Sequence, residues 1–172
     1  TPSADANENL RREGVPESRI RFVGNIMIDS LISHLRACKN GAILEKLDLK
    51  DRRFVYVTLH RPSNVDHCDS LAAIVGELSR IASQWPVIFP IHPRTSGRMK
   101  EFGLSFQKNC GVRLLDPIGY NDSLALTKHA RCVLTDSGGL QEESTFFRTP
   151  CLTLRPHTER PVTLTLGSNR LT

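Results

Sequence analysis

Short apolar runs alternate with amphipathic stretches along the chain, and each pattern predicts its own kind of element. Six apolar runs are too short for helices and predict strands. They lie at Ile20–Val23, Phe54–Leu59, Val87–Ile91, Val112–Leu115, Cys132–Thr135 and Cys151–Leu154. Strands that alternate with helices are the signature of βαβ units, so the pattern predicts an α/β fold built on a parallel sheet.

Helical periodicity is clearest between Ser70 and Ser83, where apolar residues recur at i, i+3 and i+4 spacing. Shorter helices are predicted at Met27–Ala37, Thr95–Phe102, Asn121–Ala130 and Leu140–Phe147. Asn121 or Asp122 is the expected N-cap of the helix that ends at Ala130. The Gly41–Arg53 stretch carries seven charges in thirteen residues and is predicted to be a solvated connector.

Length and composition place the chain among ordinary globular domains. Its 172 residues predict one domain, and 39% apolar with 24% charged residues excludes a disordered or fibrous protein. No apolar run approaches the roughly 20 residues of a membrane span, so no membrane partner is expected. A net charge of +5 favours anionic ligands. Because the basic residues are scattered and aromatic residues are few, a nucleic-acid partner is not expected.

The cysteines and the first residues of the chain indicate the cellular compartment and whether the sequence belongs to a longer protein. The five cysteines are Cys38, Cys68, Cys110, Cys132 and Cys151. Their odd number and the absence of a CxxC pair indicate neither a disulfide framework nor a zinc site, and we expect a cytoplasmic protein. Cys132 and Cys151 lie in apolar runs and are expected to be buried. The chain begins without a signal-peptide pattern and without Met, so we expect a piece of a longer protein.

Candidate chemistry gathers where the predicted strands end, which is where open parallel sheets bind ligands. Five of the six strand ends hold His, Arg or a glycine-rich turn. These ends are Gly24-Asn25, His60–Asn64, His92–Thr95, Asp116–Tyr120, Asp136–Gly139 and Arg155–Arg160. Because His, Arg or glycine-rich turns recur in these loops, the sequence predicts an anion-binding site at this edge of the sheet.

The Ser137-Gly138-Gly139 turn is the strongest single feature. Paired glycines admit a close ligand, and the N-H groups at a helix start suit a diphosphate. Glu143 follows one helical turn after Gly139, where it could accept hydrogen bonds from ribose hydroxyls. An ordinary tight turn with acids complementing the helix dipole is the equally weighted alternative.

Two further loops each deliver a histidine and an arginine. His60 could transfer a proton or donate to phosphate, and Arg61 could bind phosphate with two nitrogens, while a structural turn closed by Asn64 is the alternative. His92 and Arg94 repeat the theme at the next strand end. Near the last predicted strand, Arg160 belongs to a Thr-Glu-Arg-Pro segment that local sequence alone describes as a surface ion pair.

Several familiar sites are excluded by sequence. Gln141-Glu142-Glu143 lacks partners at ligand spacing, so no metal site is expected. The chain has no GxxxxGK[ST] phosphate loop, no GxGxxG fingerprint and no GxSxG nucleophile elbow.

Taken in order, the motifs resemble the non-hydrolysing UDP-N-acetylglucosamine 2-epimerases. The matching segments are NLRREGVPESRIRFVG, GNIMIDSL, VTLHRPSNVD, PIHPRTSGRM, VLTDSGGLQEES and TERPVTLTLGSNRL, which span almost the whole chain. The resemblance implies a three-layer Rossmann-like sheet with helices on both faces, forming one half of a glycosyltransferase-B type two-domain fold. It implies that residues 1–172 are the nucleotide-sugar binding C-terminal domain, with residues 1–19 approaching from the interdomain region and the partner N-terminal domain absent.

The resemblance also implies residue roles. Ser137, Gly138 and Gly139 would hold the diphosphate, Glu143 the ribose, and His60 would approach the diphosphate or sugar as the catalytic group on this chain. The uracil would lie against the loop at 117–123. The other implied substrate contacts are Arg61, Asn64, Ser123 and Arg160, and the implied activator contacts are His92 and Arg94. Pro62 and Ser63 depart from the commoner HRREN form, so no charged role carries over to them.

Family chemistry would remove the C2 proton, expel UDP and re-add it with C2 inverted, without metal or redox cofactor. The acid and base carboxylates would come from the absent domain, and the intact protein would be a homodimer. A glycosyltransferase of the same architecture, a hydrolysing epimerase and a non-catalytic nucleotide-sugar binding module remain alternatives.

Overall fold

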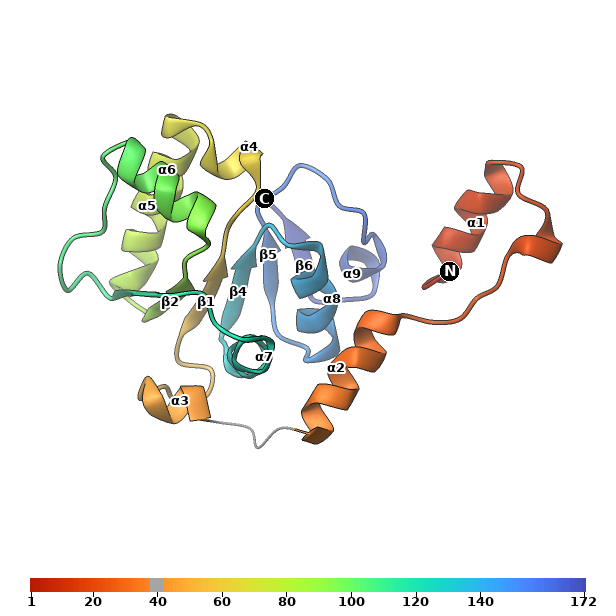
Figure 1. Ribbon diagram of the computed structural model, residues 1–172, viewed down its shortest axis with the longest axis horizontal. Coiled ribbons are helices and arrows are strands. Elements are labelled where there is room, and N and C mark those ends of the chain that lie inside the picture. Colours follow the sequence, from red (N-terminus) through yellow and green to blue (C-terminus); the bar gives the residue numbers. More distant parts are fainter. Residues whose placement is uncertain (38–41) are drawn as a thin grey trace.

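The computed structural model describes residues 1–37 and 42–172, which form a six-stranded, entirely parallel sheet with helices on both faces (Figure 1). The strand order is β3-β2-β1-β4-β5-β6. The strands are β1 (Val55–Thr58), β2 (Val87–Pro90), β3 (Val112–Leu115), β4 (Cys132–Thr135), β5 (Cys151–Thr153) and β6 (Asn169–Leu171). Strand order reverses between β1 and β4, and the end of a sheet at such a reversal is where folds of this kind bind ligands.

Helices divide between the two faces because strand side chains alternate. Val55 and Val57 pack toward α5, whereas Tyr56 packs toward α7 and α8. The first face carries α4 (Pro62–Val65), α5 (Cys68–Ala82) and α6 (Pro93–Glu101). The second carries α2 (Ile26–Ala37), α3 (Ala42–Lys46), α7 (Tyr120–His129) and α8 (Gly138–Phe146), and α9 (Val162–Thr165) lies beside β6. The predicted three-layer Rossmann-like fold class is confirmed.

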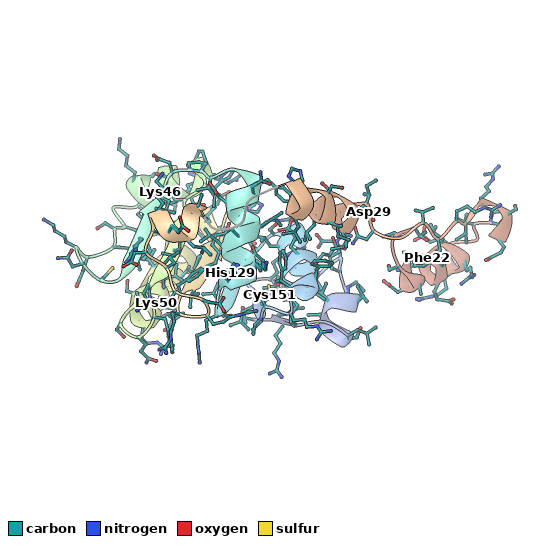
Figure 2. All side chains as sticks on the ribbon, turned by 90° about the horizontal axis from the view of Figure 1, so that it is seen from below. Phe22, Asp29, Lys46, Lys50, His129 and Cys151 are labelled. Atoms are coloured by element: carbon teal, nitrogen blue, oxygen red, sulfur yellow. The ribbon has the colours of Figure 1, made fainter. Side chains whose placement is uncertain are left out.

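The first predicted strand is wrong. Residues 20–23 are not in the sheet, and Phe22 and Val23 are 62% and 77% exposed. Val23 N donates to Thr1 O at 3.0 Å, so this run contacts the N-terminal segment with α1 (Ala4–Arg12) and a 3-10 turn (Glu17–Arg19). Phe22 lies in that segment, set apart from the sheet (Figure 2). The sixth strand is β6, which sequence analysis missed because its buried Asn169 breaks the apolar pattern.

Two local predictions also need correction. The stretch predicted as a solvated connector contains α3, whose Ile43 is buried in the core beside α7 because the apolar residues among the charges share one side. Its first residue, Gly41, and Cys38 lie outside the described residues. The N-cap of α7 is Gly119, because Ser123 N donates to Gly119 O and starts the helix earlier than expected. The Asn121 side chain contacts His34 instead.

The remaining predicted strands and helices are confirmed within a few residues at their ends. Cys151 is buried as expected, and Cys132 is only partly covered. Burial raises the pKa of both thiols, that of Cys132 to about 11. No helix in the described ranges is long and apolar enough to cross a membrane.

Candidate functional site

The loops after β1, β2 and β3 meet at one edge of the sheet and line a small open cavity of about 190 Å³. Its lining combines aromatic, apolar and imidazole groups on the β3-β2-β1 side of the reversal of strand order. The lining residues are Tyr56, Thr58, Leu59, His60, Pro90, Ile91, His92, Pro117, Ile118 and Ser123. The structure therefore brings together the predicted residues His60, His92 and Ser123. Among the described residues, no cluster of His, Cys, Asp or Glu is arranged to hold a metal ion.

Asp136 joins the two loops that flank the reversal, and sequence analysis assigned it no role. Its fully buried carboxylate lies 2.9 Å from His60 Nδ1. It also accepts hydrogen bonds from the backbone N-H groups of His60 and Arg61 and from the Asn64 amide. Burial pushes the pKa of Asp136 upward, but these hydrogen bonds, that of the His60 side chain first, outweigh it and leave the pKa below its ordinary value. The sequence shows only that Asp136 directly follows a predicted strand, and the structure adds that this strand, β4, lies beside β1.

Asn64 also connects the loops after β1 and β4. Its amide nitrogen donates to Asp136 Oδ2 at 3.1 Å and to Leu154 O at 2.9 Å. Both amide N-H groups are thus engaged inside the protein, which holds the β1 loop against the β4 and β5 ends. The Asn64 side chain therefore bridges separate loops, which differs from the alternative that it closes its own turn.

The Ser137-Gly138-Gly139 turn starts α8 as expected. Ser137 is the N-cap residue, yet its hydroxyl makes no capping hydrogen bond, so the first amides of α8 have no side-chain partner from it. At Gly138 a Cβ would lie 2.5 Å from Glu159 Oε1, whereas at Gly139 the nearest contact would be Met27 Cε at 3.7 Å. A Cβ at Gly138 would therefore displace only the end of the flexible Glu159 side chain, and the protein leaves room for a Cβ at Gly139.

Glu143 lies on α8 with 4% of its surface exposed. Burial raises its pKa, Tyr120 offsets part of that rise, and the negative charge of Glu142 adds to it. The Tyr120 hydroxyl is itself buried without a hydrogen bond of normal geometry in the described part of the chain. Burial and the Glu143 charge raise the pKa of Tyr120 to about 12. Ser123 Oγ bonds Tyr56 Oη at 2.8 Å.

Arg160 reaches α8 and is not a surface ion pair with its neighbour. Its Nε lies 3.3 Å from Glu142 Oε1, and the same oxygen accepts a hydrogen bond of 2.7 Å from Asn25 Nδ2. Thr158 Oγ1 donates to Gln141 Oε1 at 2.6 Å. These contacts fix the segment after β5 against α8, and sequence analysis missed the contribution of Glu142.

Glu159 stands between two arginines. Its Oε2 is 2.8 Å from Arg155 Nη1, and its Oε1 is 3.8 Å from Arg61 Nη2. A hydrogen bond from its own backbone N-H and the two cations hold the pKa of Glu159 below its ordinary value, against the opposing effect of burial. Arg61 consequently faces the α8 turn with a weakly held guanidinium.

His92 and Arg94 share a loop but face different partners. The His60 and His92 rings are 5.6 Å apart, and His92 Nδ1 accepts a hydrogen bond from Arg94 N at 3.1 Å. The Arg94 guanidinium binds Asp66 with two nitrogens, and Arg98 contacts the same carboxylate at 3.1 Å. Hydrogen bonds from Arg94 and then Arg98 lower the pKa of Asp66 to about 2, although burial acts in the opposite sense.

The fold and this edge define a Rossmann-like α/β domain, a class that binds ligands where strand order reverses. The family model for UDP-N-acetylglucosamine 2-epimerase matches residues 1–172. The chain belongs to the UDP-N-acetylglucosamine 2-epimerase family.

Individual relatives agree with that assignment. A UDP-N-acetylglucosamine 2-epimerase of Methanococcus maripaludis is 38% identical over 99% of this chain and 48% of its own length. A UDP-2,3-diacetamido-2,3-dideoxy-D-glucuronate 2-epimerase of Pseudomonas aeruginosa is 36% identical over 99% of this chain and 47% of its own length.

The crystal structure of the Methanocaldococcus jannaschii UDP-GlcNAc 2-epimerase in complex with UDP-GlcNAc and UDP superposes with a TM-score of 0.90. It is 38% identical and covers 100% of this chain and 49% of that one. The chain thus spans about half the length of these relatives.

Proposed function

We propose that this chain is the UDP-binding C-terminal half of an enzyme that interconverts UDP-N-acetylglucosamine and UDP-N-acetylmannosamine. Two features of α8 together carry the proposal. Its N-terminus has no side-chain capping hydrogen bond from Ser137, and the carboxyl group of Glu143, one helical turn further on, is buried. A diphosphate and a ribose diol would satisfy these two features together. Family membership and the half-length match to relatives support the proposal.

The proposed residue roles follow the edge of the sheet. The amides after Ser137, with Gly138 and Gly139, hold the diphosphate, and Arg61 adds positive charge beside them. Glu143 accepts hydrogen bonds from the ribose hydroxyls. The uracil lies over the loop at 117–123, with Ser123 fixed by Tyr56. Arg160 and Asn64 act by holding their loops in place, through Glu142 and Asp136 respectively.

The proposed reaction is elimination followed by addition. A base removes the C2 proton, the C1–O bond to UDP breaks with its electron pair leaving on the β-phosphate oxygen, and an unsaturated sugar remains. UDP then adds back at C1 while a proton is delivered to the opposite face of C2. His60 lies at the diphosphate side of this site and serves as the catalytic group of this half, and the carboxylic acid and base belong to the N-terminal half. The route needs neither metal nor redox cofactor.

Further proposals concern the intact protein. It combines this domain with an N-terminal domain in a glycosyltransferase-B type arrangement, with residues 1–19 approaching from the interdomain region. It is a cytoplasmic homodimer that serves cell-surface polysaccharide synthesis. His92 and Arg94 contribute to an activator site, which the position of His92 in the cavity lining supports.

Product analysis of the full-length protein tests the function. Incubation with UDP-N-acetylglucosamine and no acceptor is expected to give UDP-N-acetylmannosamine. Transfer that requires an acceptor would indicate a glycosyltransferase, release of free sugar and UDP would indicate a hydrolysing epimerase, and binding without turnover would indicate a binding module. A parallel arm with UDP-2,3-diacetamido-2,3-dideoxy-D-glucuronate tests the substrate named for the Pseudomonas aeruginosa relative.

A further inference from the structure

We propose that Asp136 is a positioning residue that fixes the protonated nitrogen of His60, so that Nδ1-H is held by the protein and Nε2 is left for the ligand. The ligand part of this inference rests on the proposed function, whereas the proton position rests on the free protein alone. The imidazole is 37% exposed and the carboxylate is fully buried, so the pair has a protein side and a cavity side.

The hydrogen bonds of Asp136 decide the proton position. Oδ2 accepts from Arg61 N at 2.8 Å, His60 N at 3.0 Å and Asn64 Nδ2 at 3.1 Å. Oδ1 lies 2.9 Å from His60 Nδ1 and 3.2 Å from His60 N. An ionised carboxylate can only accept, so the proton between Oδ1 and His60 must reside on Nδ1. Neutral His60 then carries a lone pair on Nε2, and a second proton makes Nε2 a donor to a phosphate oxygen.

His92 has the opposite arrangement and provides an internal reference. Its Nδ1 accepts from the backbone N-H of Arg94 at 3.1 Å, so neutral His92 carries its proton on Nε2. The two rings are 5.6 Å apart. One cavity wall therefore presents two histidines in different tautomers, and each tautomer is set by the partner of Nδ1.

The second proton on His60 couples ligand affinity to pH. The charged and titratable groups around the ring are Asp136 from the β4 loop, His92 from the β2 loop and Arg61 from its own loop. Arg61 is weakly held, 3.8 Å from Glu159, whereas Arg94 is paired with Asp66. A diphosphate diester favours the doubly protonated ring over the neutral one, so its affinity should be higher at acidic than at alkaline pH.

Replacing Asp136 with Asn should reverse the tautomer without changing the shape of the side chain. The amide oxygen must take the Oδ2 position, because three donors converge there. The amide NH₂ then points at His60 Nδ1, which has to become an acceptor, and the proton moves to Nε2. An Asn in place of the triad Asp selects the wrong tautomer in serine proteases for the same reason. In Asp136→Asn, neutral His60 keeps an Nε2-H donor, so the pH dependence of binding should disappear.

The experiment combines ¹⁵N NMR of histidine side chains with calorimetric titration of UDP-N-acetylglucosamine. This diester has no phosphate group that titrates near neutral pH, unlike UDP. Wild-type protein, Asp136→Asn and a control, Asp51→Asn, are compared at about pH 5.5 and 8. Asp51 is a matched control because its Oδ1 also lies 2.9 Å from a histidine Nδ1, that of His129, but at an exposed position.

The expected result is an Nδ1-H tautomer for neutral wild-type His60, an Nε2-H tautomer for His92, and an Nε2-H tautomer for both in Asp136→Asn. Affinity at the lower pH should fall about tenfold in Asp136→Asn, because the neutral ring keeps its Nε2-H hydrogen bond to the phosphate and loses only the positive charge, and affinity should no longer change with pH. Asp51→Asn should leave His60 and the pH profile unchanged. His60→Asn should also remove the pH dependence.

An Nε2-H tautomer for His60 in the wild-type protein overturns the inference, and so does an Asp136→Asn variant that keeps the wild-type tautomer and pH profile. The tautomer measurement on wild-type protein requires no ligand and no variant, so it remains decisive if Asp136→Asn does not fold. Failure of wild-type protein to bind the nucleotide sugar would contradict the proposed function and leave the tautomer result standing.

Discussion

The Glu143→Gln substitution distinguishes a ribose-binding role of Glu143 from a purely structural role in packing. The carboxylate is buried on α8 and would accept two hydrogen bonds from the 2′ and 3′ hydroxyls of the nucleotide. Each hydrogen bond to a charged group is worth about 1.5–3 kcal/mol. Burial disfavours the ionised carboxylate and so reduces the gain from the two bonds, and we expect Glu143→Gln to lose about 2–3 kcal/mol of binding free energy. This corresponds to an affinity for UDP reduced about 30- to 150-fold.

The same substitution should stabilise the free protein. The folded state raises the pKa of Glu143, so its ionised form lowers stability above the ordinary carboxyl pKa, and the cost is relieved as pH falls. Glu143→Gln removes that cost, and the free energy of unfolding in denaturant should rise at neutral pH. Greater stability with weaker binding is a combination that a structural role for Glu143 does not produce.

Calorimetry with UDP and 2′-deoxy-UDP provides the assay. Wild-type protein should bind the deoxy compound more weakly than UDP, and Glu143→Gln should show a much smaller difference between the two. Glu77→Gln, at an exposed position on α5, is the matched control and should behave as wild type. Unchanged affinity of Glu143→Gln for UDP, or an equal loss from the deoxy compound in both proteins, would refute the ribose assignment.

Three further predictions use the same chain. Gly138→Ala should change the free energy of unfolding by less than about 1 kcal/mol, because its Cβ would displace only the flexible end of Glu159, whose Oε1 lies 2.5 Å from the Cβ position. Gly139→Ala should leave stability unchanged or raised and weaken UDP binding in titration. Tyr56→Phe, which removes the hydroxyl bonded to Ser123, should cost about 1 kcal/mol in urea unfolding, and an unchanged midpoint would contradict it. The pKa of Asp66 is lowered to about 2, so its pairing with Arg94 stabilises the fold above pH about 4 and is lost toward pH 2; Asp66→Asn should flatten that part of the stability–pH profile.

Sequence pattern was sufficient for elements whose burial follows a simple period. The five apolar runs that became β1 to β5 and the i, i+3, i+4 spacing of α5 predicted their elements because one face or the whole run is buried. Ile20–Val23 has the same apolar character but no neighbouring strand to pair with. β6 was hidden because Asn169 is buried through hydrogen bonds from Thr153 and to Gln141 and Thr163.

The candidate site was predicted in part for a similar reason. His60, His92 and the Ser137 turn follow strands directly, and strand order places their loops at one edge. The partners that control them are far away in sequence: Asp136 for His60 and Glu142 for Arg160. Local spacing carries no information about contacts across 18 to 76 residues, so these partners became visible only once β4 was placed beside β1 and α8 beside the segment after β5.

The most direct test of the proposed function is proton NMR of UDP-N-acetylglucosamine incubated with the full-length protein in D₂O without acceptor. Elimination and re-addition of UDP predicts UDP-N-acetylmannosamine that carries solvent deuterium at C2. Conversion without deuterium at C2, or no conversion by a protein that binds UDP, would contradict it.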